Sequence, residues 1–311
     1  MANFRRNHDK ASGGGLLSKS VVFAGILGLL AYLFTMFNGG ETTESIVDEK
    51  EKERKIVIEF SDDGYVLPTE FFPTSTTGQI IKHTYYAMSY NEEHEQPEWV
   101  AYELTKESIR KPNVPRSGNF RPDPKVRKAS ASKTDYRGSG YDRGHLVPAG
   151  DMAFNEKAMS ETFYLSNMSP QIRNFNSGVW RQLEESVRDW AWDNKHIYVI
   201  TGPVLSKGIL DKIGPNKVSV PEEYYKVILD YTQPSLKGIA FLMPNEVSTL
   251  PMMDYALSID EVEEITGIDF FPEIAIEEQA ELESKYDVRS WRVEGNKERA
   301  RIQKAKELKN N

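Results

Sequence analysis

The chain has 311 residues, of which 39% are hydrophobic and 11% aromatic, so it can build a sizeable core and most of it should fold. Taken alone, the net charge of −8 argues against a nucleic-acid partner. The absence of cysteine excludes disulfides, thiolate metal sites and cysteine nucleophiles.

The first predicted element is a membrane-spanning helix over residues 21–37, a run of 17 residues without a charge. As a helix it would be about 25 Å long, close to the roughly 30 Å of a hydrocarbon core. Residues 1–20 carry four basic side chains and one acid, so they should stay in the cytoplasm. We expect a signal anchor, and hence a single-pass protein of the cell membrane with the rest of the chain outside the cytoplasm. A cleaved signal peptide with a secreted product is the alternative.

The rest of the chain divides by composition. Residues 38–63 form a charged spacer, residues 64–293 a folded domain and residues 294–311 a charged tail. The domain opens with two runs rich in aromatic and β-branched residues, 82–90 and 98–104, which predict an antiparallel hairpin.

Residues 106–143 form a strongly basic segment. It holds eleven lysines and arginines and four acids, a local charge of +7, so the remainder of the chain carries −15. Four prolines favour an irregular conformation, as in many binding loops. A solvated basic loop is the structural explanation, and a surface that attracts phosphate groups is the functional one.

The remainder of the domain mixes predicted strands and helices. Residues 174–194 are the clearest helix, because apolar side chains recur there with the 3.6-residue period. Further helices are expected over 155–161, 258–266 and 276–285, and strands over 162–166, 196–201, 224–229 and 238–243. The fold class is therefore α+β, with a central antiparallel sheet flanked by helices.

The chemistry begins in residues 142–145, which read Asp-Arg-Gly-His. If this stretch is extended, Arg143 and His145 share a face. An imidazole can then take a proton from water near neutral pH, beside a guanidinium that binds phosphate oxygens. We expect Gly144 to let a ligand approach the backbone closely. On this stretch alone, an ordinary surface or core histidine is the more frequent explanation for His145.

A second group of polar residues lies on the predicted helix. Asn176 at its start offers a carbonyl oxygen of the kind that Mg²⁺ prefers. Glu184 follows about 12 Å further along a straight helix, too far to share a direct metal bond, so it would act through a metal-bound water. A plain helix cap and a solvated glutamate are the structural alternatives.

Several motifs then occur in a recognisable order. Residues 136–149 contain the Asp-Arg-Gly-His tetrad, and they are followed by Phe163-Tyr164-Leu165-Ser166-Asn167-Met168-Ser169-Pro170-Gln171, by Asn176 and by Trp180-Arg181-Gln182-Leu183-Glu184. This set resembles the DNA/RNA non-specific endonuclease family, which includes endonuclease G and has a ββα-metal active site. The resemblance covers roughly residues 64–293.

The resemblance implies specific roles for these side chains. His145 would be the general base, with Arg143 as a catalytic and substrate-binding arginine. Asn176 would be the only direct protein ligand of one Mg²⁺, otherwise coordinated by water, with Mn²⁺ as a substitute. Glu184 would orient a metal-bound water, and Asn167 would be an active-site asparagine beside the metal.

The resemblance also implies the substrate. Arg121 would bind phosphate, and Asp142 would brace the loop. The expected reaction is Mg²⁺-dependent hydrolysis of phosphodiester bonds in DNA and RNA, leaving 5′-phosphates. A non-catalytic nucleic-acid binder, a phosphodiesterase acting on small nucleotides or lipid head groups, and an anchored adhesion protein are the alternatives. The oligomeric state stays open, a homodimer included.

Overall fold

The computed structural model describes residues 60–61, 64–65, 68–208, 210–232 and 236–292, which belong to one compact unit of the chain starting at Ile58. The predicted membrane helix over residues 21–37, nearly all of the spacer and the tail over residues 294–311 lie outside these ranges and stay predictions. Within the described ranges, no helix has both the length and the apolar composition needed to cross a membrane.

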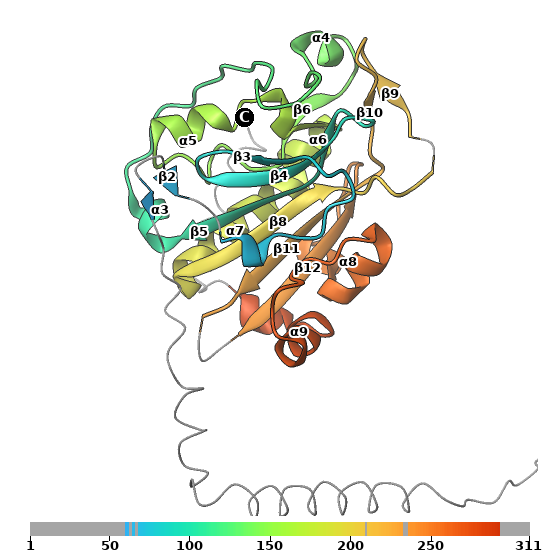
Figure 1. Cartoon of the computed structure of the whole chain (residues 1–311). Helices are drawn as coiled ribbons and strands as arrows, with labels where there is room; N and C mark the ends of the chain where they lie inside the picture. Colours follow the sequence, from blue (N-terminus) through green and yellow to red (C-terminus); the bar gives the residue numbers. More distant parts are fainter. Residues whose placement is uncertain (1–59, 62–63, 66–67, 209, 233–235, 293–311) are drawn as a thin grey trace, which may run out of the picture. The chain divides into compact units, whose positions relative to one another are not determined.

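The centre of the domain is an antiparallel sheet of seven strands in the spatial order β13-β12-β11-β8-β5-β4-β3 (Figure 1). The central strands are rich in aromatic and β-branched residues and are buried almost throughout, because both of their faces are covered. This confirms the α+β fold class with a central antiparallel sheet. The strands are β3 (Ile80–Lys82), β4 (Tyr86–Asn91), β5 (Gln96–Thr105), β8 (His196–Pro203), β11 (Glu223–Asp230), β12 (Lys237–Pro244) and β13 (Ala256–Leu257).

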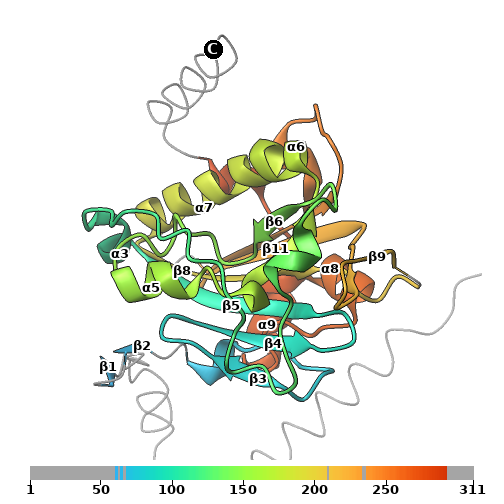
Figure 2. The same cartoon turned by 90° about the horizontal axis from the view of Figure 1, so that it is seen from above.

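Helices lie on both faces of this sheet, as alternate residues of β12 demonstrate. Phe241 stacks on Trp190 of α7 with ring centroids 5.9 Å apart. Gly238 lies three residues before Phe241 and therefore faces the other side of the sheet. It packs against Ile259 of α8 so closely that a Cβ would meet Ile259 Cδ1 at 2.7 Å. Figure 1 accordingly shows α5 and α7 on one side of the sheet and α8 and α9 on the other, and Figure 2 shows the length of α7.

The described helices are α3 (Lys106–Arg110), α4 (Lys133–Tyr136), α5 (Glu156–Glu161), α6 (Arg173–Phe175), α7 (Arg181–Asn194), α8 (Ile259–Thr266) and α9 (Ile276–Glu283). Short 3-10 turns cover Thr69–Phe71, Leu165–Asn167, Met252–Tyr255 and Val288–Trp291, and a π-helical turn, Asn176–Trp180, joins α6 to α7. Small two-stranded ribbons pair β1 (Phe60–Ser61) with β2 (Gly64–Tyr65), β6 (Asp142–His145) with β7 (Met168–Gln171), and β9 (Lys212–Ile213) with β10 (Val218–Ser219).

Most predicted elements are present, with instructive differences. The predicted strand over residues 162–166 is wrong, because Tyr164 N and Asn167 N bond to nearby carbonyls and form turns instead of a ladder. The predicted helix over residues 174–194 begins one residue earlier and is interrupted at Gly178, which has non-helical angles. The run 82–90 is also divided, since its first residue belongs to β3 and the rest mainly to β4.

Candidate active site

The Asp-Arg-Gly-His tetrad forms β6, which pairs with β7 outside the main sheet. In this antiparallel ribbon Arg143 lies opposite Pro170 and His145 opposite Met168. The chain continues from β7 directly into α6, the π-helical turn and α7. Two strands and the start of the helical segment thus bring the tetrad and Asn176 together, although some thirty residues separate them in the sequence.

Gly144 serves a purpose that the sequence did not indicate. A Cβ at this position would lie 2.1 Å from Cδ and Oε1 of Gln171, a side chain that is completely buried. The expectation that Gly144 admits a ligand is therefore wrong. The missing side chain makes room for the neighbouring strand of the ribbon.

His145 is almost fully buried, between two aromatic rings. Its ring centroid lies 5.0 Å from that of Phe163 and 5.9 Å from that of Phe120. Its Nε2 has no hydrogen-bond partner among the described residues. Burial, reinforced by the positive charges of Arg116 and Arg143, lowers the pKa of His145 to about 3. The imidazole is therefore neutral at physiological pH, which is the form that can accept a proton.

Arg143 and His145 do lie on one face of β6, since both contact Phe120. The guanidinium of Arg143 lies 4.2 Å from the centre of the Phe120 ring. Arg116, which sequence analysis missed, places its guanidinium 5.0 Å from the centre of the Phe163 ring. Each of the two aromatic rings thus holds one arginine beside the histidine through a cation–π contact.

Asn167 holds the chain that follows His145. Its side chain is completely buried, and its Oδ1 accepts from Val147 N at 2.9 Å. Its Nδ2 donates to the carbonyl oxygens of Val147 and Thr162, both at 3.0 Å. All three bonds are to backbone, so the amide fixes the position of the strand end that carries the imidazole.

Asn176 is tied to the tetrad through Asp142. Its Nδ2 donates to Asp142 Oδ2 at 3.2 Å, and Arg173 on the preceding turn pairs with Asp142 Oδ1 at 3.3 Å. Because the nitrogen is engaged by the acid, the carbonyl oxygen of Asn176 is the atom left to bind a cation. A hard oxygen donor of this kind suits Mg²⁺. The contacts of Asp142 with Asn176 and Arg173 are the physical basis of the bracing role expected for this acid.

Glu184 lies beside a charged cluster buried between α7 and the sheet. Burial raises its pKa, and Lys226 on β11 opposes this increase. Lys226 is completely buried, and its Nζ lies 4.8 Å from the Trp180 ring without a hydrogen-bond partner in the described ranges. Asp151 completes the cluster through an ion pair with Arg188 at 2.7 Å and a bond from Tyr102.

Sequence analysis missed this cluster, although the sequence contains two indications of it. Lys226 interrupts an otherwise apolar central strand, and Arg188 follows Glu184 at the i+4 spacing of one helix face. Asp151 had no such signal, because only the fold brings the loop after β6 against α7.

Arg121 contacts Tyr164 and Ser160. Its guanidinium stacks 3.9 Å from the Tyr164 ring and donates to Ser160 O at 2.9 Å. Its neighbour Phe120 contacts the imidazole, so the two adjacent residues face opposite ways. The structure therefore places Arg116, and not Arg121, among the cations beside His145.

A pocket opens next to β6, and its lining is strongly basic. Four cationic side chains and one acid contribute to it: Lys133, Arg137, Arg143, Arg173 and Asp142. Three of the four cations come from the basic segment, residues 106–143. The segment therefore leads to the tetrad in space as well as in sequence, and it gives the pocket beside β6 a positive charge.

Comparison with known proteins agrees with this geometry. A family model described as DNA/RNA non-specific endonuclease matches residues 66–276. The mitochondrial nuclease EXOG of Mus musculus is 32% identical over 278 residues, which cover 84% of this chain and 72% of that protein. The mitochondrial endonuclease G of Homo sapiens is 32% identical over 209 residues, covering 63% of this chain and 70% of its own.

A solved structure is similar as well. A chain in the crystal structure of the EndoG/EndoGI complex superposes with a TM-score of 0.59 and 31% identity, covering 76% of this chain and 95% of its own. The matched residues include β6, β7 and the helix that carries Asn176 and Glu184. This chain is therefore a nucleic-acid hydrolase that belongs to the DNA/RNA non-specific endonuclease family.

Proposed function

We propose that the chain is a Mg²⁺-dependent endonuclease that hydrolyses phosphodiester bonds in both DNA and RNA. The observation that carries the proposal is the state of His145. It is neutral, it has an unpartnered Nε2, and two arginines lie beside it. A buried neutral imidazole next to two phosphate-binding groups suits the attack of water on a phosphodiester.

Each side chain has a role that follows from its position. His145 accepts the proton of the attacking water at Nε2, and Arg143 binds the phosphate oxygens as negative charge develops on them. Arg116, whose guanidinium lies over the Phe163 ring, adds a second cation beside the imidazole. Asn167 keeps the imidazole in place through its three backbone bonds.

The residues present also fit the metal. Asn176 would hold one Mg²⁺ through its carbonyl oxygen, while Asp142 fixes the amide from the other side. The bound ion would stabilise the leaving oxygen, and a water bound to the ion would supply the proton that this oxygen takes up. Glu184, two helical turns further on, would accept hydrogen bonds from water in the site as a carboxylate. Mn²⁺, which takes similar ligands, should be able to replace Mg²⁺.

The basic pocket supports a polymeric substrate. Lys133, Arg137 and Arg173 add to the positive charge of Arg143 in one pocket, an extension that suits several phosphate groups of one strand. Contacts to the phosphate backbone alone are blind to base sequence, which suits cleavage of both nucleic acids. A small-nucleotide phosphodiesterase would have no use for this extension, and a non-catalytic binder would have no use for a neutral buried histidine.

We further propose that residues 21–37 anchor the enzyme in the cell membrane with the nuclease domain outside the cytoplasm. The support is the uncharged run itself and its basic flank. Separation from the chromosome would then protect the producing cell. Fractionation of cells, with protease accessibility of the domain from outside, tests this placement.

The function is tested by digestion of plasmid and of RNA with purified protein and Mg²⁺. We expect cleavage of both, and a loss of at least about 100-fold in kcat for His145→Ala, the usual magnitude for removing a general base. Asn176→Ala should cleave only at much higher Mg²⁺ concentrations. His94→Ala is the matched control, since His94 bonds to Ser219 away from the tetrad. Full activity in a folded His145→Ala protein would refute the proposed base.

A further inference from the structure

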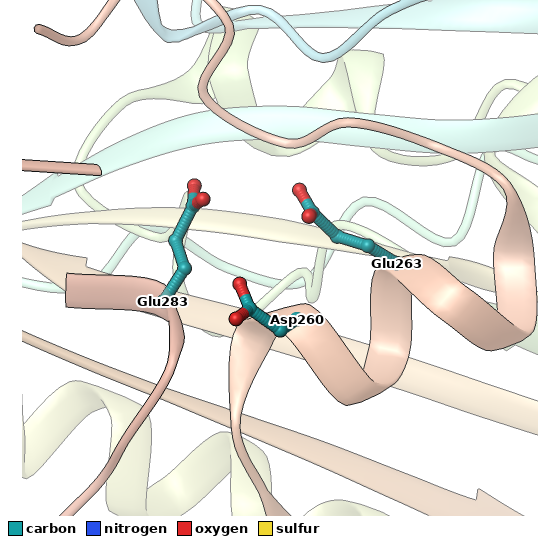
Figure 3. A group of neighbouring side chains, drawn as sticks. All are labelled: Asp260, Glu263 and Glu283. Carbon is teal, nitrogen blue, oxygen red and sulfur yellow. The ribbon is translucent and has the colours of Figure 1, made fainter. Parts of the chain in front are cut away.

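Three acidic side chains gather on the face of the sheet opposite His145. Asp260 and Glu263 lie one turn apart on α8, and Glu283 is the last residue of α9. One carboxylate oxygen from each lies within 4.8 Å of the other two. Figure 3 shows the three carboxylates turned toward one shared space.

Glu283 makes this cluster more than a group of surface acids. Its side chain is only 4% exposed, and its Oε1 is buried without a hydrogen-bond partner among the described residues. An unpaired buried carboxylate oxygen is strongly unfavourable, because water no longer solvates it. This oxygen therefore calls for either a proton or a cation.

Among the described residues, those that line the surroundings of this cluster include no cationic side chain. The residues that line the depression between α8 and α9 include Asp269 as a fourth acid, and none of these described residues is a lysine or arginine. Burial and the neighbouring acids raise the pKa of Glu263 to about 7 and that of Glu283 to about 8. A bound cation would relieve the repulsion that these acids exert on one another.

We propose that Asp260, Glu263 and Glu283 bind a divalent metal ion, with Ca²⁺ the best fit. Two oxygens 4.8 Å apart can lie on opposite sides of one ion at about 2.4 Å each, which is the Ca²⁺–oxygen distance, and a third oxygen within 4.8 Å of both reaches the same ion after a shift of at most about 0.4 Å per ligand. Mg²⁺ needs about 2.1 Å and a nearly ideal octahedron, which a site shared by two separate helices supplies less readily. The ion would tie the start of α8 to the end of α9.

This site is separate from the proposed catalytic one. The cluster belongs to α8 and α9, whereas Asn176 and Glu184 belong to the helix on the other face of the sheet. The site would therefore stabilise the domain without taking part in phosphodiester hydrolysis. It rests on residues that the proposed mechanism does not use.

The experiment is thermal unfolding of the purified full chain at about pH 9, above the raised pKa values of Glu263 and Glu283, after removal of metals with a chelator. Adding about 1 mM Ca²⁺, which saturates most protein calcium sites, should raise Tm by several degrees. Glu283→Gln should lower the Ca²⁺ affinity at least about ten-fold, because one charged ligand is lost. Without Ca²⁺, the same variant should be at least as stable as the wild type, because a repulsive charge is gone.

Two controls locate the effect. Glu264→Gln removes the same charge from an exposed neighbour on α8 and should keep the full response to Ca²⁺. Asn176→Ala should also keep it, which separates this site from the catalytic metal. An unchanged Tm of the wild type with Ca²⁺ would overturn the proposal. So would an increase in Tm of the same size in Glu283→Gln and Glu263→Gln.

Discussion

At the scale of single residues, burial decides the charge of the groups that act. Burial and two nearby arginines keep His145 neutral, while burial keeps a proton on Glu184 to higher pH than usual. Lys226 moderates the second effect, because its positive charge favours the ionised glutamate. One lysine inside the sheet thus lowers the pKa of the carboxylate that we propose for the active site.

The pH dependence of kcat/KM should reveal this arrangement. In the proposed mechanism Glu184 acts as a carboxylate, and its pKa is raised to about 7, so activity should fall as the pH drops through about 7. His145, with a pKa of about 3, should add no loss in that range. Lys226→Met removes the charge that favours the carboxylate, so the acid limb should move upward by roughly one pH unit. The measurement is kcat/KM against pH at fixed Mg²⁺.

Lys237→Met is the matched control for this change. Lys237 is a partly buried lysine on the adjacent strand β12 and lies over Trp291, so it shares the chemistry but not the site. The Lys237→Met change should leave the acid limb of the pH profile of kcat/KM at the same pH as in the wild type. An unmoved limb in a folded Lys226→Met protein would show that Lys226 does not control Glu184.

At the scale of elements, the β6–β7 ribbon depends on one small residue. The side chain of Gln171 occupies the space that a side chain at position 144 would need. Both amide atoms of Gln171 lack hydrogen-bond partners within the described ranges. The side chain of Gln171 is therefore held by packing rather than by hydrogen bonds. Any group added at Gly144 must displace it and shift the strand that carries His145.

Gly144→Ala should accordingly lower the free energy of unfolding by about 1–3 kcal/mol, the usual cost of overpacking. It should reduce kcat as well, since the imidazole moves with β6. Gln171→Ala opens the same space, so the double variant should recover most of the stability. Urea denaturation of the four proteins measures this coupling. An equal cost of Gly144→Ala in both backgrounds would contradict the packing explanation.

At the scale of the whole molecule, charge is segregated. A segment of +7 lies in a chain whose remainder carries −15, and part of it lines the pocket beside β6. In the proposed function the acidic remainder would repel nucleic acid from the rest of the surface, and the basic segment would attract it to the site. The total charge of −8 therefore says little about the partner.

Cleavage should decline steeply with salt, because bound phosphates release condensed counterions. Arg137→Gln removes one cation of the pocket and should reduce the slope of log(kcat/KM) against log[salt] by about 0.9 on duplex DNA. Lys285→Gln, an exposed lysine just beyond α9, should leave the slope unchanged. Equal slopes for all three proteins would mean that the pocket does not contact the phosphate backbone.

The sequence by itself determined the features that depend on local periodicity and on motif order. Alternation along an extended chain placed Arg143 and His145 on one face, and the structure confirms it. The 3.6-residue period located the long helix, and the order of the motifs indicated the family. These properties are fixed within a few residues of chain.

Only the tertiary structure decided which distant residues share a space. It set Arg116 beside His145, Lys226 near Glu184 and Gln171 against Gly144. It also joined the acids of α8 and α9 into one cluster. No local pattern predicts such pairs, because contacts between segments far apart in sequence arise from how the sheet and helices pack.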